Sequence, residues 1–536
     1  MHKRILQINA ASCRHEVVEK DDPDVVGILD YAVREHLREK TYALSLFDEG
    51  NAFLLGIGPL VQAQDSSRSL VCMTRSPTAH ALSCTALSEA GLLLHGAGFD
   101  AVKITGRAKV LSILLIRNFD QYLEARLIPL ERQQLFEIYD SLPGGVESFD
   151  SYLARTYGSA FNHRTTAEFQ LLCCGPAAFL THMGSLHTAT VSALSEGRIQ
   201  FQNKSQTASG GFGSALVQGH NVCAVLFSGN VHERNIPRSA RSAETAFTNG
   251  QRTVMRPVIE RPIIDRTVGN FGLDSEDAEH IYSFVKDSLS HGLLNQKDIG
   301  MKIPELKNTA AGDSLKASLL RDITYGRTGF GRVFQHGLRQ AVKELSAAHR
   351  EQEKEKNMSF YDLAWYMPFG KSGYMLYSSK GSFSPLFPLL MNTGNSRIAH
   401  SQGMLHDPRK LGKRMAERYL TELFALNMGL LDQPSQEKVS QELSKSIDQD
   451  CAEYSVLTKK TAQLFHDYNA KAGALPIFWE SANMPELVMQ QLEEARFAGF
   501  PDPHLQRWLT AFRKNKIAAG HDYFYEMMSG AEKAIL

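Results

Sequence analysis

One stretch of the chain, Gly210 to Asn230, gathers glycines that could hold a ligand through the backbone (GGFGSALVQGHNVCAVLFSGN). Glycine lacks a Cβ, so it adopts positive φ easily and lets a ligand or another segment approach closely. The apolar run Val222–Phe227 that follows predicts a buried strand. Alone, this pattern is more typical of a structural turn before a strand, so any chemistry depends on the segments that accompany it.

Cysteines could supply a metal site, a cluster or a nucleophile, and the chain has seven: Cys13, Cys72, Cys84, Cys173, Cys174, Cys223 and Cys451. No two of them form a CxxC pair, and none stands with histidine at zinc-ligand spacing. The pair Cys173-Cys174 lies in an apolar run, which favours buried structural thiols. An odd, scattered set is typical of a reducing compartment, so we expect a cytoplasmic protein.

Size and charge limit the classes of partner. At 536 residues, the chain exceeds one hydrophobic core, so two or three domains are expected. The 58 basic residues equal the 58 acidic residues in number, which leaves no global positive field for nucleic acid or anionic lipid. The N-terminal apolar run Ile5–Ile8 is shorter than a signal peptide needs, and Val110–Ile116 is too short to span a bilayer. A small molecule or another protein is therefore the expected partner.

The elements that position these residues predict an α+β protein. Residues 1–230 alternate short apolar runs with turn signals, which predicts a mixed, β-rich and sandwich-like domain. The expected strands are Ile5–Asn9, Ala43–Phe47, Ala52–Ile57, Ser69–Thr74, Ala101–Thr105, Leu111–Arg117 and Cys223–Ser228, and the expected helices are Val25–Leu37 and Ala86–His95. Residues 231–268 are polar and proline-containing, as in a linker or extended segment. Residues 269–536 are predicted to be mostly helical and to form two subdomains.

Three further features have plainer explanations than a site. The glycines of Gly326–Gly331 resemble a phosphate loop, but without a preceding strand a helix–helix connection is the better interpretation. His400 lies among polar residues and is a weak candidate for an acid–base residue, since a lone histidine is more often simply hydrogen-bonded. The aromatic segment Phe360–Phe383 could line a cavity, although core packing is more typical of such a run.

Four segments of the N-terminal half stand in a fixed order. They are Gly58-Pro59 with Arg68 and Arg75-Ser76-Pro77; Gly91 with Ala97–Ala108 (AGFDAVKITGRA); Cys174–Phe179 (CGPAAF); and the glycine stretch Gly210–Asn230. This set resembles the N-terminal domain of the aldehyde ferredoxin oxidoreductase family. In the helical half, Asn270–Asp274 and Leu426–Leu431 are similar to the family's two DxxGL motifs.

The resemblance implies a tungsten or molybdenum atom held by two pterins, an iron–sulfur cluster, and oxidation of an aldehyde to an acid. Pterin phosphates need backbone donors and an arginine, for which Arg68 is the matching residue. The positions to which the resemblance assigns cofactor binding are Arg68, Thr85, Gly91, Gly210, Gly211, Gly213, Asn270, Gly272, Leu273, Asp274, Gly429 and Leu430. No side chain is predicted to ligate the metal, and the catalytic residues are not identified beyond the weak candidate His400.

The chain departs from the family where the cluster and the pterins bind. An iron–sulfur cluster needs thiolates, yet no cysteine occurs between Cys223 and Cys451, and Leu431 stands at the family's cysteine position. We therefore expect no cluster in this chain. Thr85, Leu87, Ser88, Ser209, Gly269 and Leu426 replace family residues at the pterin site. Each loss would leave a buried pterin donor unpaired, at about 1–3 kcal/mol.

Two hypotheses from different classes follow. The first is an oxidoreductase that acts on an aldehyde or oxo group through a tungsto- or molybdopterin and receives or passes electrons through a separate protein or diffusible carrier. The second is a cofactor-free paralogue, either repurposed for other small-molecule chemistry or acting as a non-catalytic partner of an intact family enzyme. A homodimer is a further candidate assembly; nucleic acid and membrane are not expected partners.

Overall fold

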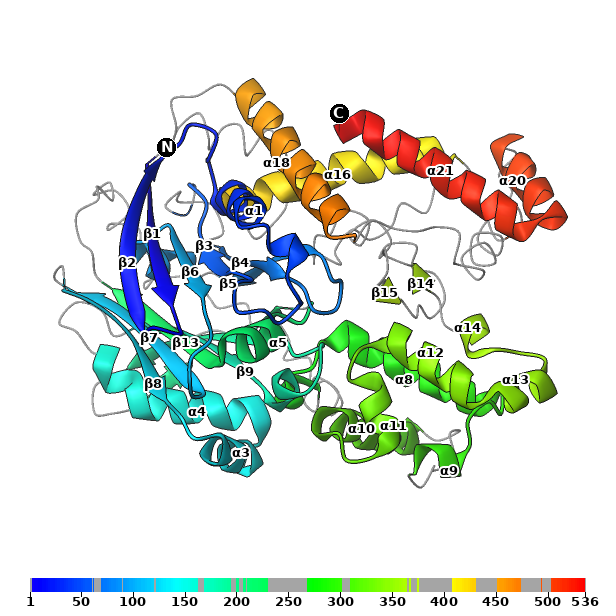
Figure 1. Ribbon diagram of the computed structural model, residues 1–536, viewed down its shortest axis with the longest axis horizontal. Coiled ribbons are helices and arrows are strands. Elements are labelled where there is room, and N and C mark those ends of the chain that lie inside the picture. The colour runs from blue at the N-terminus through cyan, green and yellow to red at the C-terminus, as the bar shows by residue number, and fades with distance from the viewer. Residues whose placement is uncertain are drawn as a thin grey trace, which may run out of the picture.

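The computed structural model describes residues 2–59, 61, 69–88, 90–119, 122–161, 168–193, 199–201, 206–208, 210–229, 268–300, 309–363, 366–367, 374–375, 407–429, 451–473, 493 and 503–535. Within them, two β-sheets lie beside two groups of helices (Figure 1).

The first sheet is mixed and has the strand order β2-β1-β6-β3-β4-β5. Its strands are β1 (His2–Asn9), β2 (Arg14–Asp21), β3 (Phe53–Gly56), β4 (Leu70–Arg75), β5 (Leu82–Ser88) and β6 (Ala101–Thr105). Strand β1 runs parallel to β6, and the other neighbours are antiparallel.

The second sheet has the order β11-β10-β9-β13-β7-β8, with β12 paired to β10. Its strands are β7 (Ser112–Phe119), β8 (Tyr122–Pro129), β9 (Glu168–Cys174), β10 (Leu186–Ala193), β11 (Ile199–Phe201), β12 (Gln206–Ala208) and β13 (Val222–Gly229). A separate two-stranded piece consists of β14 (Tyr366–Met367) and β15 (Tyr374–Met375).

Alternation along the strands of the first sheet divides their side chains between two cores. Phe53 and Leu55 of β3 enter the core shared with the second sheet, whereas Leu54 between them enters a core shared with helices. In the same way, Cys72 of β4 faces the second sheet and Val71 faces the helices. Successive side chains of a strand point to opposite faces, so both faces of this sheet are buried.

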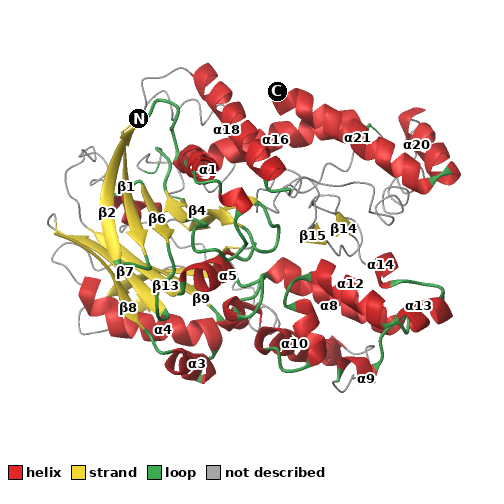
Figure 2. Ribbon diagram, viewed as in Figure 1, coloured by secondary structure: helices red, strands yellow, loops and turns green. Residues whose placement is uncertain are grey.

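Helices cover the outer faces of the sheets and make up most of the described residues after β13 (Figure 2). Those within or beside the sheets are α1 (Ile28–Arg38), α2 (Gly91–Gly96), α3 (Arg132–Asp140), α4 (Gly145–Tyr157) and α5 (Phe212–Ser214), with short 3₁₀ turns at Thr41–Ala43, Gly158–Phe161 and Pro176–Phe179 and a π-helical turn at Ala215–Gly219. The others are α8 (Ser275–Ser290), α9 (Gln296–Ile299), α10 (Thr309–Tyr325), α11 (Gly329–Phe334), α12 (Leu338–Ala348), α13 (Arg350–Lys356), α14 (Phe360–Leu363), α16 (Pro408–Met428), α18 (Cys451–Lys471), α20 (Pro503–Lys514) and α21 (Lys516–Ile535).

The later helices belong to two separate hydrophobic cores. Helices α8, α10, α11 and α12 bury their apolar faces together with Ala177 and Met183 from the sheet region. Helices α16, α18, α20 and α21 pack with α1 on the outer face of the first sheet. Segments that are hundreds of residues apart in sequence thus share a core.

The predicted α+β class with helical later regions is confirmed. Six of the predicted strands occur, as β1, β3, β4, β6, β7 and β13. The strand predicted at Ala43–Phe47 is wrong: the segment is a turn whose carbonyls at Leu44, Ser45 and Leu46 accept hydrogen bonds from the side chains of Arg75 and Asn51. The helix predicted at Ala86–His95 begins only at Gly91, because Leu82–Ser88 pairs with β4 instead.

Other predictions have mixed outcomes. Cys173 and Cys174 are buried free thiols, as expected, and the glycines after α10 connect it to α11. The boundary segment 231–268 lies outside the described residues except for Val268, so the domain limits stay predictions. Among the described helices, none is long and apolar enough to cross a membrane.

Four buried or half-buried histidines predict a loss of stability in acid. Burial lowers the pKa of His36 to about 3, and those of His182, His187 and His280 to about 4. An unfolded histidine has a pKa of about 6.5, so between about pH 6.5 and pH 4 the unfolded chain binds more protons than the folded chain. The free energy of unfolding therefore falls as pH falls through 6.5. Asp150 acts in the opposite direction. Because burial raises its pKa to about 7, the folded chain holds a proton there that the unfolded chain has lost.

The urea midpoint, followed by circular dichroism, is expected to be lower at pH 5.5 than at pH 7.5. The exposed-histidine variant His15→Gln should keep this difference, and His187→Gln should reduce it. Equal midpoints at both pH values would contradict the assignment of these histidines as neutral in the folded chain.

Candidate functional site

Three of the sequence motifs meet at the start of the glycine stretch. The backbone N–H of Gly210 donates to Oδ2 of Asp274 at 2.7 Å, and the Ser76 hydroxyl donates to the Gly210 carbonyl at 2.6 Å. Gly210 has φ +96°, which few residues other than glycine adopt. The turn after β4, the glycine stretch and the start of α8 are therefore joined at one residue, and we call this contact the first junction.

Two further glycines let the same stretch approach the segment before β10. A Cβ on Gly211 would lie 2.2 Å from the His182 carbonyl oxygen, and Gly211 also has φ +76°. A Cβ on Gly213 would lie 2.2 Å from the Ser185 carbonyl oxygen. Only a residue without a Cβ fits these positions, so packing accounts for both glycines without any ligand.

The first helical motif is tied to the same segment by its backbone. Ser185 N–H donates to the Gly272 carbonyl at 2.7 Å, and Asp274 N–H donates to the Met183 carbonyl at 2.8 Å. Leu273 forms an isolated β-bridge with Gly184. These bonds fix Asp274 beside Gly210.

Glycines also provide close approach around this motif. Gly272, at φ +67°, would bring a Cβ to 2.7 Å from the Cα of Gly175. A Cβ on Gly145 would lie 1.9 Å from the carbonyl oxygen of Asn270. Asn270 thus contributes backbone to this contact.

The second helical motif forms another junction, at the end of α16. Ser69 N–H donates to the Gly429 carbonyl at 3.1 Å, and Gly429 ends the helix at φ +86°. A Cβ on Gly58 would lie 2.0 Å from the carbonyl carbon of Met428. The segment around Gly58-Pro59 and the end of α16 are therefore in direct contact, and we call this the second junction.

Asn427 fixes α16 at that place by capping a different helix. Its Oδ1 accepts from the backbone N–H of Leu29 at 2.9 Å, at the start of α1, and its Nδ2 donates to Asp30 at 2.7 Å. Asp30 also accepts from Gly27 N–H at 3.0 Å and from the Thr461 hydroxyl. Asn427 and Asp30 are both buried.

Strand β4 links the two junctions. Ser69 precedes it and Ser76 follows it. The six residues of β4, at about 3.3 Å each, therefore separate the two junctions by roughly 20 Å. Thr85 lies between them, because it pairs with Cys72 in the middle of β4. Thr85 is buried, and its hydroxyl makes a long 3.5 Å bond to the Ala86 carbonyl. Gly91, the first residue of α2, is buried.

The candidate positions Arg68, Leu430 and His400 lie outside the described residues, as does Ser209. Arg75, which precedes Ser76, directs its guanidinium to the carbonyls of Thr41, Leu44 and His80 rather than toward the first junction. Within the described part, no group of three or more His, Cys, Asp or Glu side chains is arranged to hold a metal ion.

Imidazole rings gather beside the first junction. Nε2 of His182 lies 3.2 Å from Nδ1 of His336, which is exposed and follows α11. The His182 ring also contacts the rings of Phe47 and His80, with centroids 5.2 and 6.2 Å away. Nδ1 of His182 is buried and has no hydrogen-bond partner. Burial, and secondarily the charge of His336, lowers the pKa of His182 to about 4, so the ring is neutral at pH 7.

The described residues suit a pterin at the first junction but not at the second. At the first junction, the Asp274 carboxylate could accept from it, since a carboxylate has about four acceptor positions and the N–H groups of Gly210 and Asp277 donate to that of Asp274. The adjacent turn from Gly210 to Gly213 is packed against the His182 and Ser185 carbonyls, so it would contact the pterin only from its other side. The positions of the first aspartate in the two DxxGL-like motifs provide no hydrogen-bond acceptor side chain. Gly269 has no side chain, and Leu426 is 3% exposed in the apolar core with α1 and α18.

Sequence reasoning missed His182, His336 and the capping role of Asn427. Histidine in isolation carries no local signal, and the partner of His182 is 154 residues away. Asn427 stands inside a recognised motif, but its amide caps a helix 397 to 398 residues earlier.

Comparisons with known proteins agree on the fold and the N-terminal domain. Residues 5–229 match the family model of the aldehyde ferredoxin oxidoreductase N-terminal domain. Glyceraldehyde-3-phosphate:ferredoxin oxidoreductase of Pyrococcus furiosus is 22% identical over 630 aligned positions, covering 92% of this chain and 93% of the relative. An uncharacterized protein of Methanocaldococcus jannaschii is 26% identical over 226 residues, covering 42% of this chain and 32% of that protein.

A solved structure shares the fold along the whole chain. It is the active site complex BamBC of benzoyl coenzyme A reductase with 1,5-dienoyl-CoA, which aligns with a TM-score of 0.59 and 13% identity over 100% of both chains.

Substitution of Gly211 should disturb the first junction. Gly211→Ala places a Cβ against the His182 carbonyl at positive φ, and we expect a loss of about 1–3 kcal/mol in unfolding free energy. The matched control is Gly219→Ala in the same stretch, because a Cβ there meets nothing within 4 Å. Urea denaturation should separate the two variants, and equal stabilities would contradict the tight approach at Gly211.

Substitution of Asn427 should disturb the second junction. Asn427→Ala leaves the buried N–H groups of Leu29 and Asp30 without their acceptor, and we expect a loss of about 1–3 kcal/mol. Asn295 caps α9 in a similar way but at an exposed site, so Asn295→Ala should cost less. If both variants unfold at the same urea concentration, Asn427 does not hold α16 in place.

Proposed function

The chain belongs to the aldehyde ferredoxin oxidoreductase family, and we propose that it oxidises or reduces an aldehyde or related oxo group through a tungsto- or molybdopterin without an iron–sulfur cluster of its own. The observation that carries the proposal is the first junction. There, the Gly210 turn contacts both Ser76 and Asp274, and these three residues belong to three separate family-like motifs of the sequence.

The chemistry of these groups supports a pterin at this place. Backbone N–H groups of a glycine turn bind anions, and a carboxylate accepts hydrogen bonds from ring N–H groups. Asp274 would accept from the pterin here, the adjacent turn from Gly210 to Gly213 would contact it, and Arg68 is the proposed phosphate ligand. When bound, the metal would supply two-electron redox chemistry, by which an aldehyde and water give a carboxylic acid, two protons and two electrons.

Electrons would leave through another molecule. A cluster requires thiolate ligands, and the sequence has no cysteine between Cys223 and Cys451. We therefore propose that a separate electron-transfer protein or a diffusible carrier takes the electrons. The solved structure of similar fold is the active site complex BamBC of benzoyl coenzyme A reductase, and we propose that this chain also assembles with a partner subunit.

A second candidate function rests on the second junction. The position of the motif's leading aspartate holds Leu426, buried in an apolar core, and the adjacent Asn427 amide is engaged by α1. These features would suit a cofactor-free paralogue, either repurposed for other small-molecule chemistry or paired with an intact family enzyme. This alternative predicts a well-folded chain that carries no metal.

Elemental analysis separates the two functions. Full-length protein purified from its native host, grown with tungstate and molybdate, should contain about one tungsten or molybdenum atom per chain and release a fluorescent pterin derivative. The variant Arg68→Ala should contain less pterin, whereas Arg14→Ala on the exposed strand β2 should be unchanged. A folded protein with neither metal nor pterin would exclude the oxidoreductase proposal and favour the paralogue.

A further inference from the structure

We propose that His182 and His336 form a proton relay between the first junction and solvent. This inference rests on the proposed function, because oxidation of an aldehyde by water releases two protons with the two electrons. It concerns residues that the sequence motifs do not include.

The geometry provides a continuous path through two imidazole rings. Nδ1 of His182 is buried without a partner, Nε2 of His182 lies 3.2 Å from Nδ1 of His336, and His336 is exposed. A proton accepted at Nδ1 of His182 can therefore leave from Nε2 to Nδ1 of His336, and His336 can release its Nε2 proton to water. Each ring gains one proton and loses one, so the pair ends with the charge it began with.

The backbone of His182 anchors the inner ring of the pair beside the proposed cofactor site. The His182 carbonyl is the atom that approaches Gly211, one residue after the glycine that binds Asp274 and Ser76. Met183, the next residue, accepts the backbone N–H of Asp274. The ring of His80, four residues after Ser76, lies 6.2 Å from the His182 ring between centroids.

The groups around the His182 ring favour proton transfer through the ring over a permanently charged imidazolium. The rings against His182 are His80, His336 and Phe47, and its backbone N–H donates to the Gln335 carbonyl. Among the described residues, Nδ1 of His182 has no hydrogen-bond partner and Nε2 faces His336, so no carboxylate is bonded to the ring. Because its pKa is lowered to about 4, the ring is neutral at pH 7 and can accept at one nitrogen while donating from the other.

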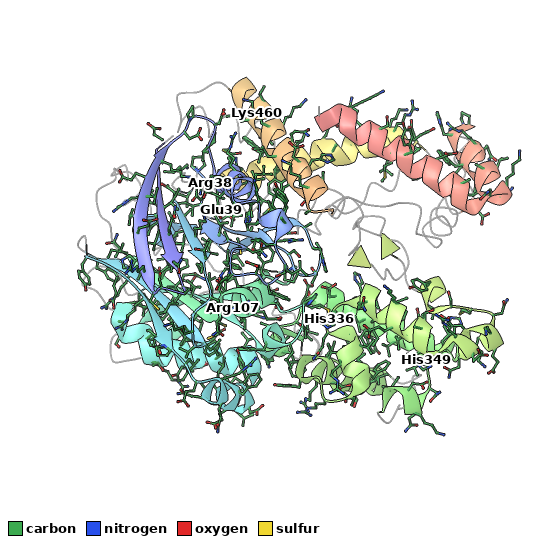
Figure 3. The ribbon with its side chains drawn as sticks, in the orientation of Figure 1. Arg38, Glu39, Arg107, His336, His349 and Lys460 are labelled. Atoms are coloured by element: carbon green, nitrogen blue, oxygen red, sulfur yellow. The ribbon has the colours of Figure 1, made fainter. Side chains whose placement is uncertain are left out.

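Figure 3 shows a matched control within the same helical region. His336 lies next to the sheet region, whereas His349, between α12 and α13, lies farther from it. His349 contacts Gln352 rather than another histidine in a relay. The variants His336→Gln and His349→Gln therefore remove one ring each, at different distances from the first junction.

The first measurement needs no bound cofactor. Deuterium exchange at the histidine C2 position, followed by mass spectrometry over a range of pH, reports the titration of each ring in the full-length chain. The His336→Gln variant should move the His182 midpoint upward by about half a unit or more, because a neighbouring positive charge is lost. His349→Gln should leave it unchanged. An unchanged midpoint in His336→Gln would overturn the relay.

The second measurement uses metal-loaded protein with a short aliphatic aldehyde and a viologen dye as electron acceptor. His336→Gln should lower kcat roughly tenfold or more, because a proton-transfer group is lost, and added imidazole should restore the rate. His349→Gln should match the wild type. A kcat and pH profile unaltered by His336→Gln would overturn the relay while leaving the proposed function intact. If the wild type holds no metal and oxidises no aldehyde, the proposed function fails, and the exchange measurement alone decides whether the pair shares a proton.

Discussion

The arrangement of the molecule depends on close backbone contact at Gly210 to Gly213. A strand-to-helix turn can pass within van der Waals distance of the His182 and Ser185 carbonyls only where no Cβ stands between them. That approach brings the segment before β10 against the start of α8, where Ser185 and Met183 bond to Gly272 and Asp274. Because Ala177 and Met183 then enter the core of α8, α10, α11 and α12, the same contact attaches this helical region to the sheets.

The second junction follows the same principle with a different device. There Gly58 and Gly27 leave room for the end of α16, and Asn427 near that end caps the start of α1. Buried N–H groups at the start of α1 need acceptors, so the Asn427 amide is worth more there than at an exposed cap. Strand β4 then sets the distance between the junctions.

These two junctions bear differently on cofactor chemistry. At the first, a carboxylate lies beside a glycine turn, and a carboxylate that accepts the N–H groups of Gly210 and Asp277 has about four acceptor positions in total. At the second, the position of the family's acceptor belongs to the apolar core through Leu426. Both junctions hold distant segments together, while polar groups suited to a pterin occur at only one of them in the described part of the chain.

Sequence alone determined the family, the α+β class and most strands of the first sheet, because short-range alternation and ordered glycine motifs express local constraints. It also identified Asp274 and the glycines as a related set. Tertiary structure decided what those residues contact: Asp274 meets Gly210 across 64 positions, Asn427 caps α1 across nearly 400, and His182 meets His336 across 154. Such contacts arise from packing between distant segments, and no local periodicity of the sequence predicts them. For the same reason, Leu82–Ser88 became a strand, since pairing with β4 outweighed its helical pattern.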